Sequence, residues 1–384
     1  MGAEAFRGIT MVYLDNAATT LIKPAAVSES TAYAIKHLAS PGRGGHSASM
    51  EAANKLYDCR ENASKLFNVD LAEKIIFTSN ATHALNIAIS TFLKPGIRVV
   101  VSGYEHNAVM RPLFAAKARV RIASSPLINR KKTLEAFKRE IRKGADLVIC
   151  THVSNVFGFV LPIKEIGQLC RANRIPFIID ASQSAGSEKI DFSALGPDFI
   201  AMPGHKGLYG PQGTGILLCK NTGKPILYGG TGSASAKMEM PPFLPDRLEA
   251  GTHNMPGICG LNEGIRFVQK VKTEEIKSHE KELINLTYER LSKVSGIILY
   301  HSENSNEQSG LISFNLQELS SEETAEKLGE LEIAVRGGLH CSPAAHKTVG
   351  TFPTGTVRVS VSAFNTDSDI FALEDALKFI TSKV

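Results

Sequence analysis

The segment 145–182, ADLVICTHVSNVFGFVLPIKEIGQLCRANRIPFIIDAS, decides the fold of this 384-residue chain. It begins with ADLVICTH and ends with PFIIDAS, two short runs that are rich in apolar residues, and a helical pattern lies between them. Strands that alternate with helices in this way lie parallel in one sheet and are joined by crossover connections. The segment therefore predicts a βαβ unit.

Further runs of the same kind lie on both sides of this unit. Between about residues 75 and 220 the full series, in chain order, is KIIFTS, RVVVSG, VRIASS, ADLVICTH, PFIIDAS, DFIAMPG and TGILLC. Helical patterns alternate with these runs, which predicts an α/β fold with a mostly parallel seven-stranded sheet covered by helices on both faces. Ligands of such sheets bind at the carboxyl ends of the strands, so we expect the functional site there.

The pattern changes after the Gly/Ser/Pro-rich stretch 229–245, GGTGSASAKMEMPPFLP. One long helical segment is expected from about Gly260 to Ser295, and it is followed by the runs GIILYHS, GLISFNL, IAVRGG and TVRVSVS, with helices at 321–331 and from Asp367. This order predicts a smaller α+β domain. We expect a large domain at 18–255 and a small domain formed by 1–17 together with 256–384.

Composition argues against several classes of protein. The net charge is only +5, and the densest basic segment, 129–144, places its apolar residues at helical spacing, which indicates a solvated helix face rather than a nucleic-acid site. No apolar run is long enough to span a bilayer. The six cysteines lack C-x-x-C pairs and metal-ligand spacing. This scatter argues against disulfides and a metal site and favours a cytoplasmic location.

Polar residues stand at the ends of two predicted strands. Asp180 ends the run 176–182, with Gln183 one turn later, while His205 and Lys206 follow the run 198–204. A buried carboxylate needs a cation or a hydrogen-bond donor. A lysine held among apolar residues can have a lowered pKa, which suits bond formation with an aldehyde. Taken alone, Asp180 could equally be a helix cap or turn residue, and Lys206 could be an ordinary solvated lysine in a loop.

Three more strand ends complete a pattern. Thr82 begins a helix whose free N–H groups can bind a phosphate, although an ordinary capped helix fits equally well. His106 and Asn155 follow two further strands. Pyridoxal 5'-phosphate requires a lysine for its aldehyde, a carboxylate for its pyridinium nitrogen, donors for its phenolic oxygen, an aromatic or imidazole face over its ring and a phosphate cup. The sequence offers a residue for each role.

Eight segments, in order along nearly the whole chain, resemble the group V aminotransferases and specifically the cysteine desulfurases. They are YLDNAATT (13–20), EHNAV (105–109), HVSNVFG (152–158), IDASQS (179–184), GHKGLYGPQGTGIL (204–217), EAGTHN (249–254), VRGGLHC (335–341) and GTVRVSVSAFNT (355–366). The resemblance implies the fold of type I pyridoxal phosphate enzymes, a homodimer and a desulfurase that converts L-cysteine to L-alanine.

The resemblance also implies roles around the cofactor ring. Lys206 would bind the aldehyde, Asp180 would hold the pyridinium proton and Gln183 would bond the phenolic oxygen. His106 would stack on the ring and help to move protons. Asn155 would contact the cofactor and the carboxylate of the substrate.

For the phosphate, the resemblance implies Thr82 and His205, with Thr252 reaching the cofactor of the neighbouring subunit. The sequence departs from the commonest family pattern here. Ala81 stands where a hydroxyl residue often precedes Thr82, Pro203 takes the place of a frequent phosphate-binding serine, and Gly207 is inserted after Lys206. We therefore expect the cup to rely more on backbone N–H groups and His205.

Cys341 would be the catalytic nucleophile, because the glycine-rich loop and Arg336 give it a polar, cation-adjacent setting that favours the thiolate. A persulfide on Cys341 would then carry the sulfur. Arg358 would bind the substrate carboxylate, for which a guanidinium is well shaped. Arg336 matches a further family arginine, and a surface salt bridge is its alternative role. The five other cysteines are expected in the core.

The loop that carries Cys341 has Leu339 where a well-known branch of the family has a second histidine. Its short continuation to Arg358 resembles the branch with a compact cysteine loop, so sulfur delivery is expected to need an acceptor protein that docks at the site. Two alternatives stay open: a selenocysteine lyase or another group V enzyme that uses the same pocket, and a catalytically silent scaffold. Sequence does not separate sulfur from selenium substrates.

Overall fold

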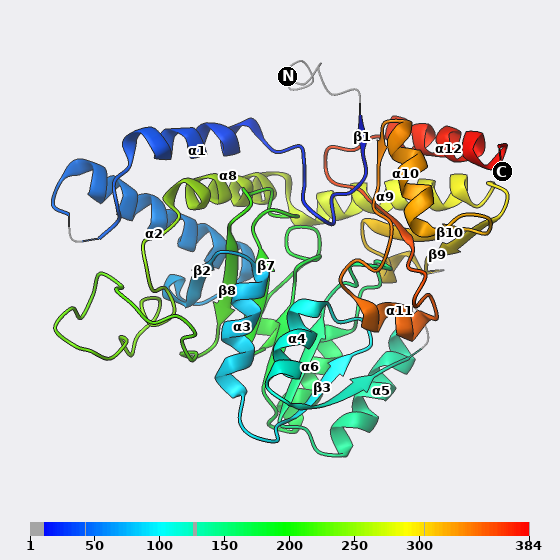
Figure 1. Ribbon diagram of the computed structural model, residues 1–384. Coiled ribbons are helices and arrows are strands. Elements are labelled where there is room, and N and C mark those ends of the chain that lie inside the picture. Colours follow the sequence, from blue (N-terminus) through cyan, green and yellow to red (C-terminus); the bar gives the residue numbers. More distant parts are fainter. Residues whose placement is uncertain (1–10, 43, 126–128, 303, 384) are drawn as a thin grey trace.

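The computed structural model describes residues 11–42, 44–125, 129–302 and 304–383, and it contains the predicted seven-stranded sheet (Figure 1). The strand order is β2-β8-β7-β6-β5-β3-β4, and β8 is antiparallel to both of its neighbours while the other pairs are parallel. All seven predicted runs form these strands, which are β2 (Ile75–Thr78), β3 (Arg98–Ser102), β4 (Arg119–Ala123), β5 (Leu147–Thr151), β6 (Phe177–Asp180), β7 (Phe199–Pro203) and β8 (Gly215–Cys219).

Helices cover both faces of the sheet, as predicted. Along β3, Val99 and Val101 pack in the cluster formed with α3 (Ala81–Phe92) and α4 (Asn107–Ala115). Val100 points to the opposite cluster, which the other helices cover. These are α2 (Ser47–Phe67), α5 (Arg130–Arg142), α6 (Ile163–Ala172), α7 (Phe192–Leu195) and α8 (Met255–Val271). Because helices bury both faces of the sheet, polar side chains of the strands are expected at the strand ends.

The C-terminal third forms a second, smaller core. An antiparallel sheet in the order β12-β10-β9 packs with α9, α10 and α12 around apolar residues such as Phe314 and Leu373. The elements of this part of the chain are α9 (Thr273–Leu291), β9 (Ile297–Tyr300), β10 (Leu311–Leu316), α10 (Ser321–Glu330), β12 (Val357–Ser360) and α12 (Asp367–Thr381), together with α11 (Pro343–Val349), whose Ala345 packs in the core of the large sheet. Two short 3₁₀ turns lie at Ala72–Lys74 and Ser305–Glu307.

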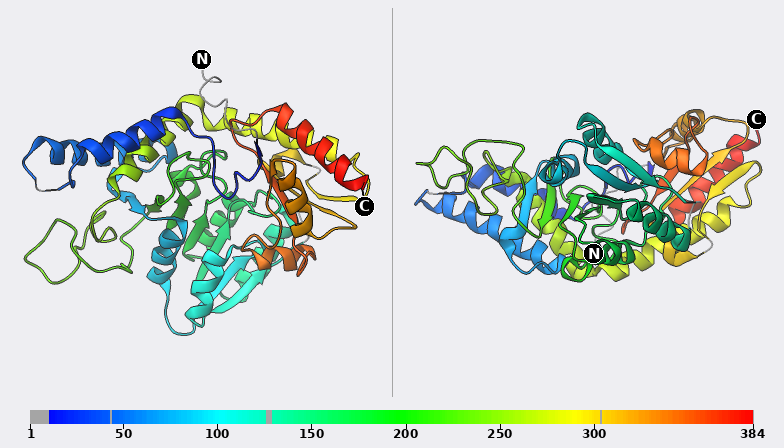
Figure 2. Two further views of the ribbon diagram at one scale, coloured as in Figure 1. Left: turned by 45° about the horizontal axis from the view of Figure 1, so that its top comes forward. Right: turned by 90° about the horizontal axis from the view of Figure 1, so that it is seen from below.

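The N-terminal segment joins this second core. Strand β1 (Val12–Tyr13) lies parallel to β11 (Ile333–Ala334), and Asp15 bridges to Ser360. The yellow-to-red C-terminal elements gather at one end of the molecule, and α1 (Ala25–His37) with the start of α2 lies at the other (Figures 1 and 2). The expected domain boundaries stay a prediction.

One expected element is wrong. The helical segment at 260–295 is not a single helix, because it breaks between α8 and α9 at Lys272, whose φ of 77° lies in the left-handed region. Glu274 and Glu275 then occupy the first turn of α9, where acidic side chains favour a new helix start. In the described part of the chain, no helix combines the length and the apolar character needed to cross a membrane.

Phe157 connects the two cores. It is fully buried in the connection after β5, and its ring meets Tyr300 of β9 and His346 of α11 edge-on, with ring centroids 5.6 and 5.7 Å apart. Edge-to-face aromatic pairs add to the stabilisation that burial provides. The packing of the small core on the large one therefore depends in part on this ring.

Replacing Phe157 by alanine is expected to lower the free energy of unfolding by about 3–5 kcal/mol, because it removes a buried ring and leaves a cavity. Urea unfolding of the purified protein measures the change. The matched control is Phe114→Ala, since the Phe114 side chain is 86% exposed; it should change stability by less than about 0.5 kcal/mol. Equal stabilities of the two variants would contradict the assignment.

Candidate active site

A pocket of about 540 Å³ lies at the carboxyl edge of the large sheet. It brings together most of the residues that the sequence singled out, and they follow the ends of five strands, β2, β3, β5, β6 and β7. From the predicted set, its lining includes Ala81, Thr82, His106, Asn155, Asp180, Gln183, His205 and Lys206. Residues separated by more than 120 positions in the sequence therefore share one cavity.

Lys206 occupies the turn after β7. Burial lowers the pKa of its ammonium group to about 8, and the charge of Arg358 adds to this effect. Among the described residues, no hydrogen bond or ion pair is assigned to its Nζ atom. Gly207 lets this turn pack closely, since a β-carbon there would clash with the carbonyl oxygen of Ala185. Lys206 is thus a buried amine that loses its proton more readily than an ordinary lysine, which favours its reaction with an aldehyde.

Asp180 ends β6 and is 3% exposed. Its Oδ1 atom accepts hydrogen bonds from the backbone N–H and the hydroxyl of Ser182. This fixes the orientation of the carboxylate and leaves Oδ2 for a further donor. Gln183, one turn later, donates from Nε2 to the carbonyl oxygen of Ala17. Both side chains line the pocket, so a carboxylate and an amide face the same space.

His106 is the N-cap residue of α4. Its Nδ1 atom accepts a hydrogen bond of 3.0 Å from the N–H of Ala108, so the neutral ring carries its proton on Nε2. Burial lowers the pKa of His106, and the attraction of Asp180 only partly opposes this effect. The neutral ring lies against the pocket, where it can stack on a flat ligand.

The N-terminus of α3 forms another wall. Asn80 caps this helix by accepting a hydrogen bond from the N–H of His83, while the amides of Ala81 and Thr82 belong to the first helical turn, whose N–H groups have no partner within the helix. His205 lies opposite with a buried Nδ1 atom that has no partner among the described residues. Burial lowers the pKa of His205 to about 4. Free N–H groups at a helix N-terminus are suited to binding a phosphate.

Arg358 and Arg336 converge on one carboxylate, that of Asp15. Arg358 is almost fully buried, and its Nη2 atom lies 2.7 Å from Asp15 Oδ1. Arg336 donates from Nε and Nη2 to Asp15 Oδ2, at 3.0 and 2.8 Å. Arg336 is thus in a salt bridge, yet the buried Nε of Arg358 has no partner among the described residues. Arg358 therefore keeps guanidinium N–H groups that no described residue uses, and such groups suit a ligand carboxylate.

Cys341 is exposed, whereas the other five cysteines are buried, as expected. Burial raises the pKa of Cys170 to about 12 and that of Cys259 to about 11, which makes these thiols unreactive. The loop of Cys341 reaches the pocket from the small core, because Asn107 at the start of α4 donates its N–H to the carbonyl oxygen of Cys341 at 2.8 Å. Asn107 directly follows His106, which lines the pocket, so this bond connects the cysteine loop to the pocket wall.

Thr252 is not brought to this pocket. It lies in a separate groove between α2 and the loop 229–253, beside Glu249 and His253. Glu249 pairs there with the buried Arg60 and accepts a hydrogen bond from His253. The expected contact between Thr252 and a phosphate stays a prediction.

Pyridoxal 5'-phosphate fits the residues of the Lys206 pocket. The donor set matches the group part by part: an amine with a pKa lowered to about 8 for the aldehyde, Oδ2 of Asp180 for the ring nitrogen, and the first turn of α3 for the phosphate. Asp180, Gln183 and His106 surround the space for the ring.

The sequence model of the family described as Aminotransferase class-V matches residues 12–373, so the chain belongs to that family. A probable cysteine desulfurase of Methanothermobacter thermautotrophicus is 32% identical, with 96% of this chain and 94% of the relative covered. One from Halalkalibacterium halodurans is also 32% identical, with 98% and 94% covered. Within its family, the chain is accordingly a member of the cysteine desulfurase group and a pyridoxal phosphate-dependent enzyme.

Solved structures agree with this placement. The apo structure of a cysteine desulfurase from Thermococcus onnurineus superposes with a TM-score of 0.89 at 29% identity, covering 97% of this chain and 95% of the other. A cysteine desulfurase from Escherichia coli gives a TM-score of 0.86 at 25% identity, with the same coverage. The fold is therefore that of type I pyridoxal phosphate enzymes, as the sequence predicted.

Sequence reasoning missed two residues at this site. Asp15 lies within the quoted motif YLDNAATT, but its pairing with two arginines more than 320 positions away leaves no local signal. Glu280 in α9 lies within a helical pattern that reads as an exposed face. It is instead buried, and it lines a second, small pocket beside the backbone of Lys206.

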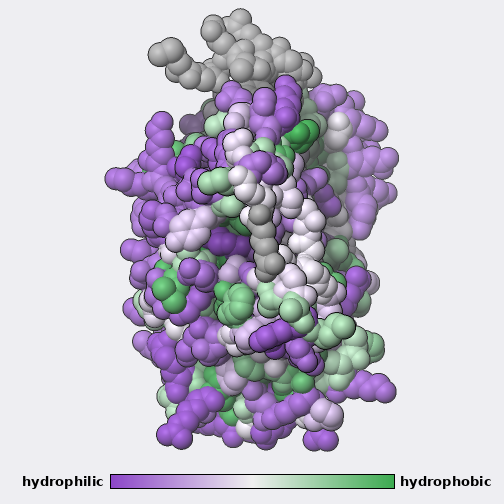
Figure 3. Space-filling model, turned by 90° about the vertical axis from the view of Figure 1, so that its left-hand side faces the viewer, coloured by the Kyte–Doolittle hydropathy of each residue, from purple (hydrophilic) through white to green (hydrophobic). Residues whose placement is uncertain are grey.

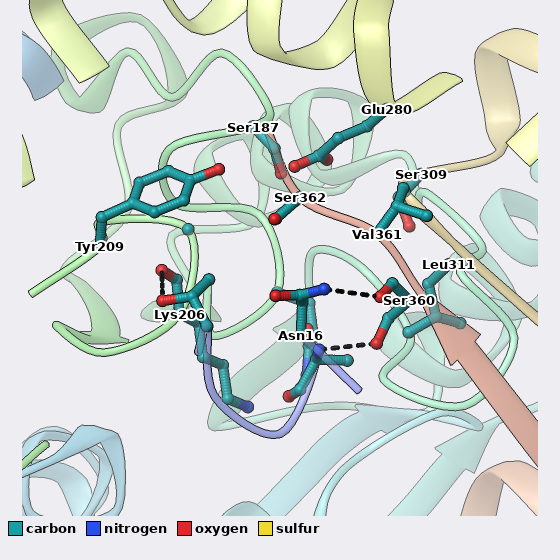
Figure 4. A pocket seen from close by; sticks show the side chains of 15 residues that line it. Asn16, Ser187, Lys206, Tyr209, Glu280, Ser309, Leu311, Ser360, Val361 and Ser362 are labelled. Atoms are coloured by element: carbon teal, nitrogen blue, oxygen red, sulfur yellow. Dashed lines mark hydrogen bonds between the residues drawn. The ribbon is translucent and has the colours of Figure 1, made fainter. Parts of the chain in front are cut away.

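Figure 4 shows the Glu280 carboxylate pointing into this second pocket, while the side chain of Lys206 runs away from it. Burial raises the pKa of Glu280 to about 8, and the neighbouring Glu188 adds to the effect. In the unfolded chain the same carboxyl titrates near 4.5. Between these two values the unfolded chain releases a proton that the folded protein keeps, so stability falls as pH rises.

The Glu280→Gln variant is expected to lose this pH dependence. Wild type should lose up to about 1.4 kcal/mol of unfolding free energy per pH unit from this group between pH 5 and 8, and the variant should not. Urea unfolding at several pH values measures the difference between the two proteins, in which other buried acids cancel. Glu275→Gln, at an exposed position of the same helix, is the control. Parallel pH profiles of wild type and Glu280→Gln would contradict the assignment.

Proposed function

We propose that this enzyme is a cysteine desulfurase that converts L-cysteine to L-alanine and holds the released sulfur as a persulfide on Cys341. The observation that carries the proposal is the placement of Cys341. Among the described cysteines it is the exposed one, and its carbonyl oxygen is bonded to Asn107, next to the pocket residue His106. An exposed thiol thus lies on a loop whose backbone is bonded to the residue next to the pocket residue His106.

The bound cofactor supplies an electron sink that weakens the Cβ–S bond of the substrate. Lys206 binds the cofactor and, with a pKa near 8, takes and returns the proton at the substrate Cα. Arg358 orients the substrate carboxylate, while Asp15 offsets one of the two positive charges of Arg336 and Arg358. Asp180 stabilises the protonated ring nitrogen.

The sulfur step is a displacement at the substrate sulfur. The thiolate of Cys341 forms an S–S bond as the Cβ–S bond of cysteine breaks, and the electron pair of the broken bond stays on carbon. The carbon takes up a proton to become the methyl group of alanine. The sulfur atoms are oxidised, the carbon is reduced, and no external oxidant is required. The persulfide is then available to a thiol or to an acceptor protein.

A homodimer is part of the proposal. Thr252 lies in a groove that shares no lining residue with the Lys206 pocket, so its family role needs a partner subunit. Figure 3 shows apolar patches among polar ones on the face at the left of Figure 1. The exposed apolar side chains of α1, α2 and the loop 220–254 also favour a partner: Tyr33, Ile35, Met50, Tyr57, Leu227, Tyr228, Met238 and Phe243. A cytoplasmic location and a docked sulfur acceptor complete the proposal.

The test is alanine formation from L-cysteine by the purified holoenzyme with a thiol reductant. Wild type should form alanine, and Cys341→Ala should lose at least about a hundredfold in rate because the attacking thiolate is gone. Cys259→Ala, which removes a buried thiol, is the matched control and should stay active. The visible absorbance of the cofactor confirms that each protein is loaded.

L-selenocysteine is assayed in parallel. Alanine from selenocysteine alone, at equal rates in wild type and Cys341→Ala, would make the enzyme a selenocysteine lyase and contradict the persulfide role. No alanine from either substrate, with the cofactor bound, would favour the silent scaffold.

A further inference from the structure

Each residue of the segment 340–342 is bonded to a residue outside the loop, His340 and Cys341 through the backbone and Ser342 through its side chain. The side chain of Asn155 donates from Nδ2 to the carbonyl oxygen of His340 at 2.8 Å. The N–H of Asn107 binds the carbonyl oxygen of Cys341 at 2.8 Å. The hydroxyl of Ser342 lies 2.6 Å from Oδ1 of Asn155. The nucleophile therefore stands between two residues that share one partner, Asn155.

The directions of these bonds are fixed by chemistry. A carbonyl oxygen only accepts, so the amide nitrogen of Asn155 must face His340 and its oxygen must face Ser342. Ser342 is then the donor. Its side chain is fully buried, so removing either partner would leave a buried polar atom unpaired.

Ser342 stands at the N-cap of α11, a position where serine usually accepts a hydrogen bond from the first helical turn. Here its side chain makes no cap hydrogen bond. The hydroxyl is used for Asn155 instead. Ser342 therefore uses its hydroxyl for a tertiary contact with the pocket residue Asn155 and not for capping the helix.

The loop also has an unfavourable backbone conformation. His340 and Cys341 have φ angles of 49° and 56°, in the left-handed region that residues with a β-carbon avoid. Such a conformation persists only where surrounding contacts hold it. The bonds to Asn155 and Asn107, together with the bond from His340 Nε2 to the carbonyl oxygen of Thr356, are those contacts.

Asn155 belongs to the pocket as well as to the loop. Its side chain lines the cavity with Asp180 and Lys206, and its own carbonyl oxygen accepts a hydrogen bond from Arg358 Nη1 at 3.0 Å. The same residue therefore touches the space for the cofactor, the substrate arginine and the loop of the nucleophile.

We propose that Asn155 and Ser342 form a clamp that holds Cys341 in register with the pocket, which makes Ser342 a positioning residue for the attack on the substrate sulfur. This inference rests on the proposed function. Ser342 is absent from the pocket lining, so its replacement removes no direct contact with the substrate and is expected to act on the sulfur step. A misplacement of the nucleophile by an ångström is enough to slow such a step severely.

The experiment compares Ser342→Ala, which removes the donor, with Ser342→Thr, which keeps a hydroxyl, in the holoenzyme. Hydrogen–deuterium exchange of the peptide covering 335–346 reports loop opening without any need for turnover. We expect exchange about tenfold faster in Ser342→Ala, from the loss of one buried hydrogen bond, and near wild type in Ser342→Thr. The N–H of Asn107, which donates to the carbonyl oxygen of Cys341, should also exchange faster in Ser342→Ala. Ser292→Ala, at an exposed position, is the control.

Kinetics provide the second readout. For alanine formation from L-cysteine, kcat of Ser342→Ala should fall about tenfold with KM unchanged, and Ser342→Thr should restore it. Unchanged exchange and unchanged kcat in Ser342→Ala would overturn the inference. A wild type that forms no alanine would defeat the proposed function, while the exchange result still decides the clamp.

Should Ser342→Ala unfold, seen as fast exchange throughout the chain, Asn155→Asp decides the question. This variant keeps the acceptor for Ser342 but cannot donate to the carbonyl oxygen of His340. Faster exchange confined to the loop supports the clamp, and exchange equal to wild type overturns it.

Discussion

The site depends on one constraint, the common direction of β3, β5, β6 and β7. Parallel strands end at the same edge, so the residues that follow them meet whatever their separation in the sequence. Both faces of these strands are buried under helices, which leaves this edge as the place where polar side chains gather. His106, Asn155, Asp180 and Lys206 each occupy one strand end. The cofactor pocket is a direct consequence of the sheet topology.

The smaller core supplies what the sheet edge lacks. It brings a thiol and two guanidinium groups, and the N-terminal segment fastens them there, because β1 pairs with β11 and Asp15 joins Arg336 to Arg358. A buried arginine without a carboxylate partner would be costly. Asp15 lowers that cost, while the Nε atom of Arg358 has no partner among the described residues.

Local patterns predicted the seven strands of the sheet and the burial of five cysteines, because apolar runs and their turns act over a few residues. They failed where the outcome depends on distant partners. The helix breaks at Lys272 because the backbone there is left-handed, and the sequence pattern stays helical through this position. Asp15 and Ser342 bond to residues that lie 343 and 187 positions away in the sequence, so no local pattern marks these contacts. Thr252 lies apart from the pocket, and its role at the cofactor of a neighbouring subunit stays a prediction. Cofactor roles were predictable only because a family pattern links the distant segments.

The central claim is that Cys341 takes the sulfur atom from the substrate. Mass spectrometry of a single turnover tests it most directly: holoenzyme is mixed with one equivalent of L-cysteine in the absence of reductant, and the intact protein and its peptides are weighed. The account predicts one added sulfur atom on the peptide that contains Cys341, in equal amount to the alanine formed. Alanine without added sulfur on Cys341, or added sulfur on another cysteine, would contradict it.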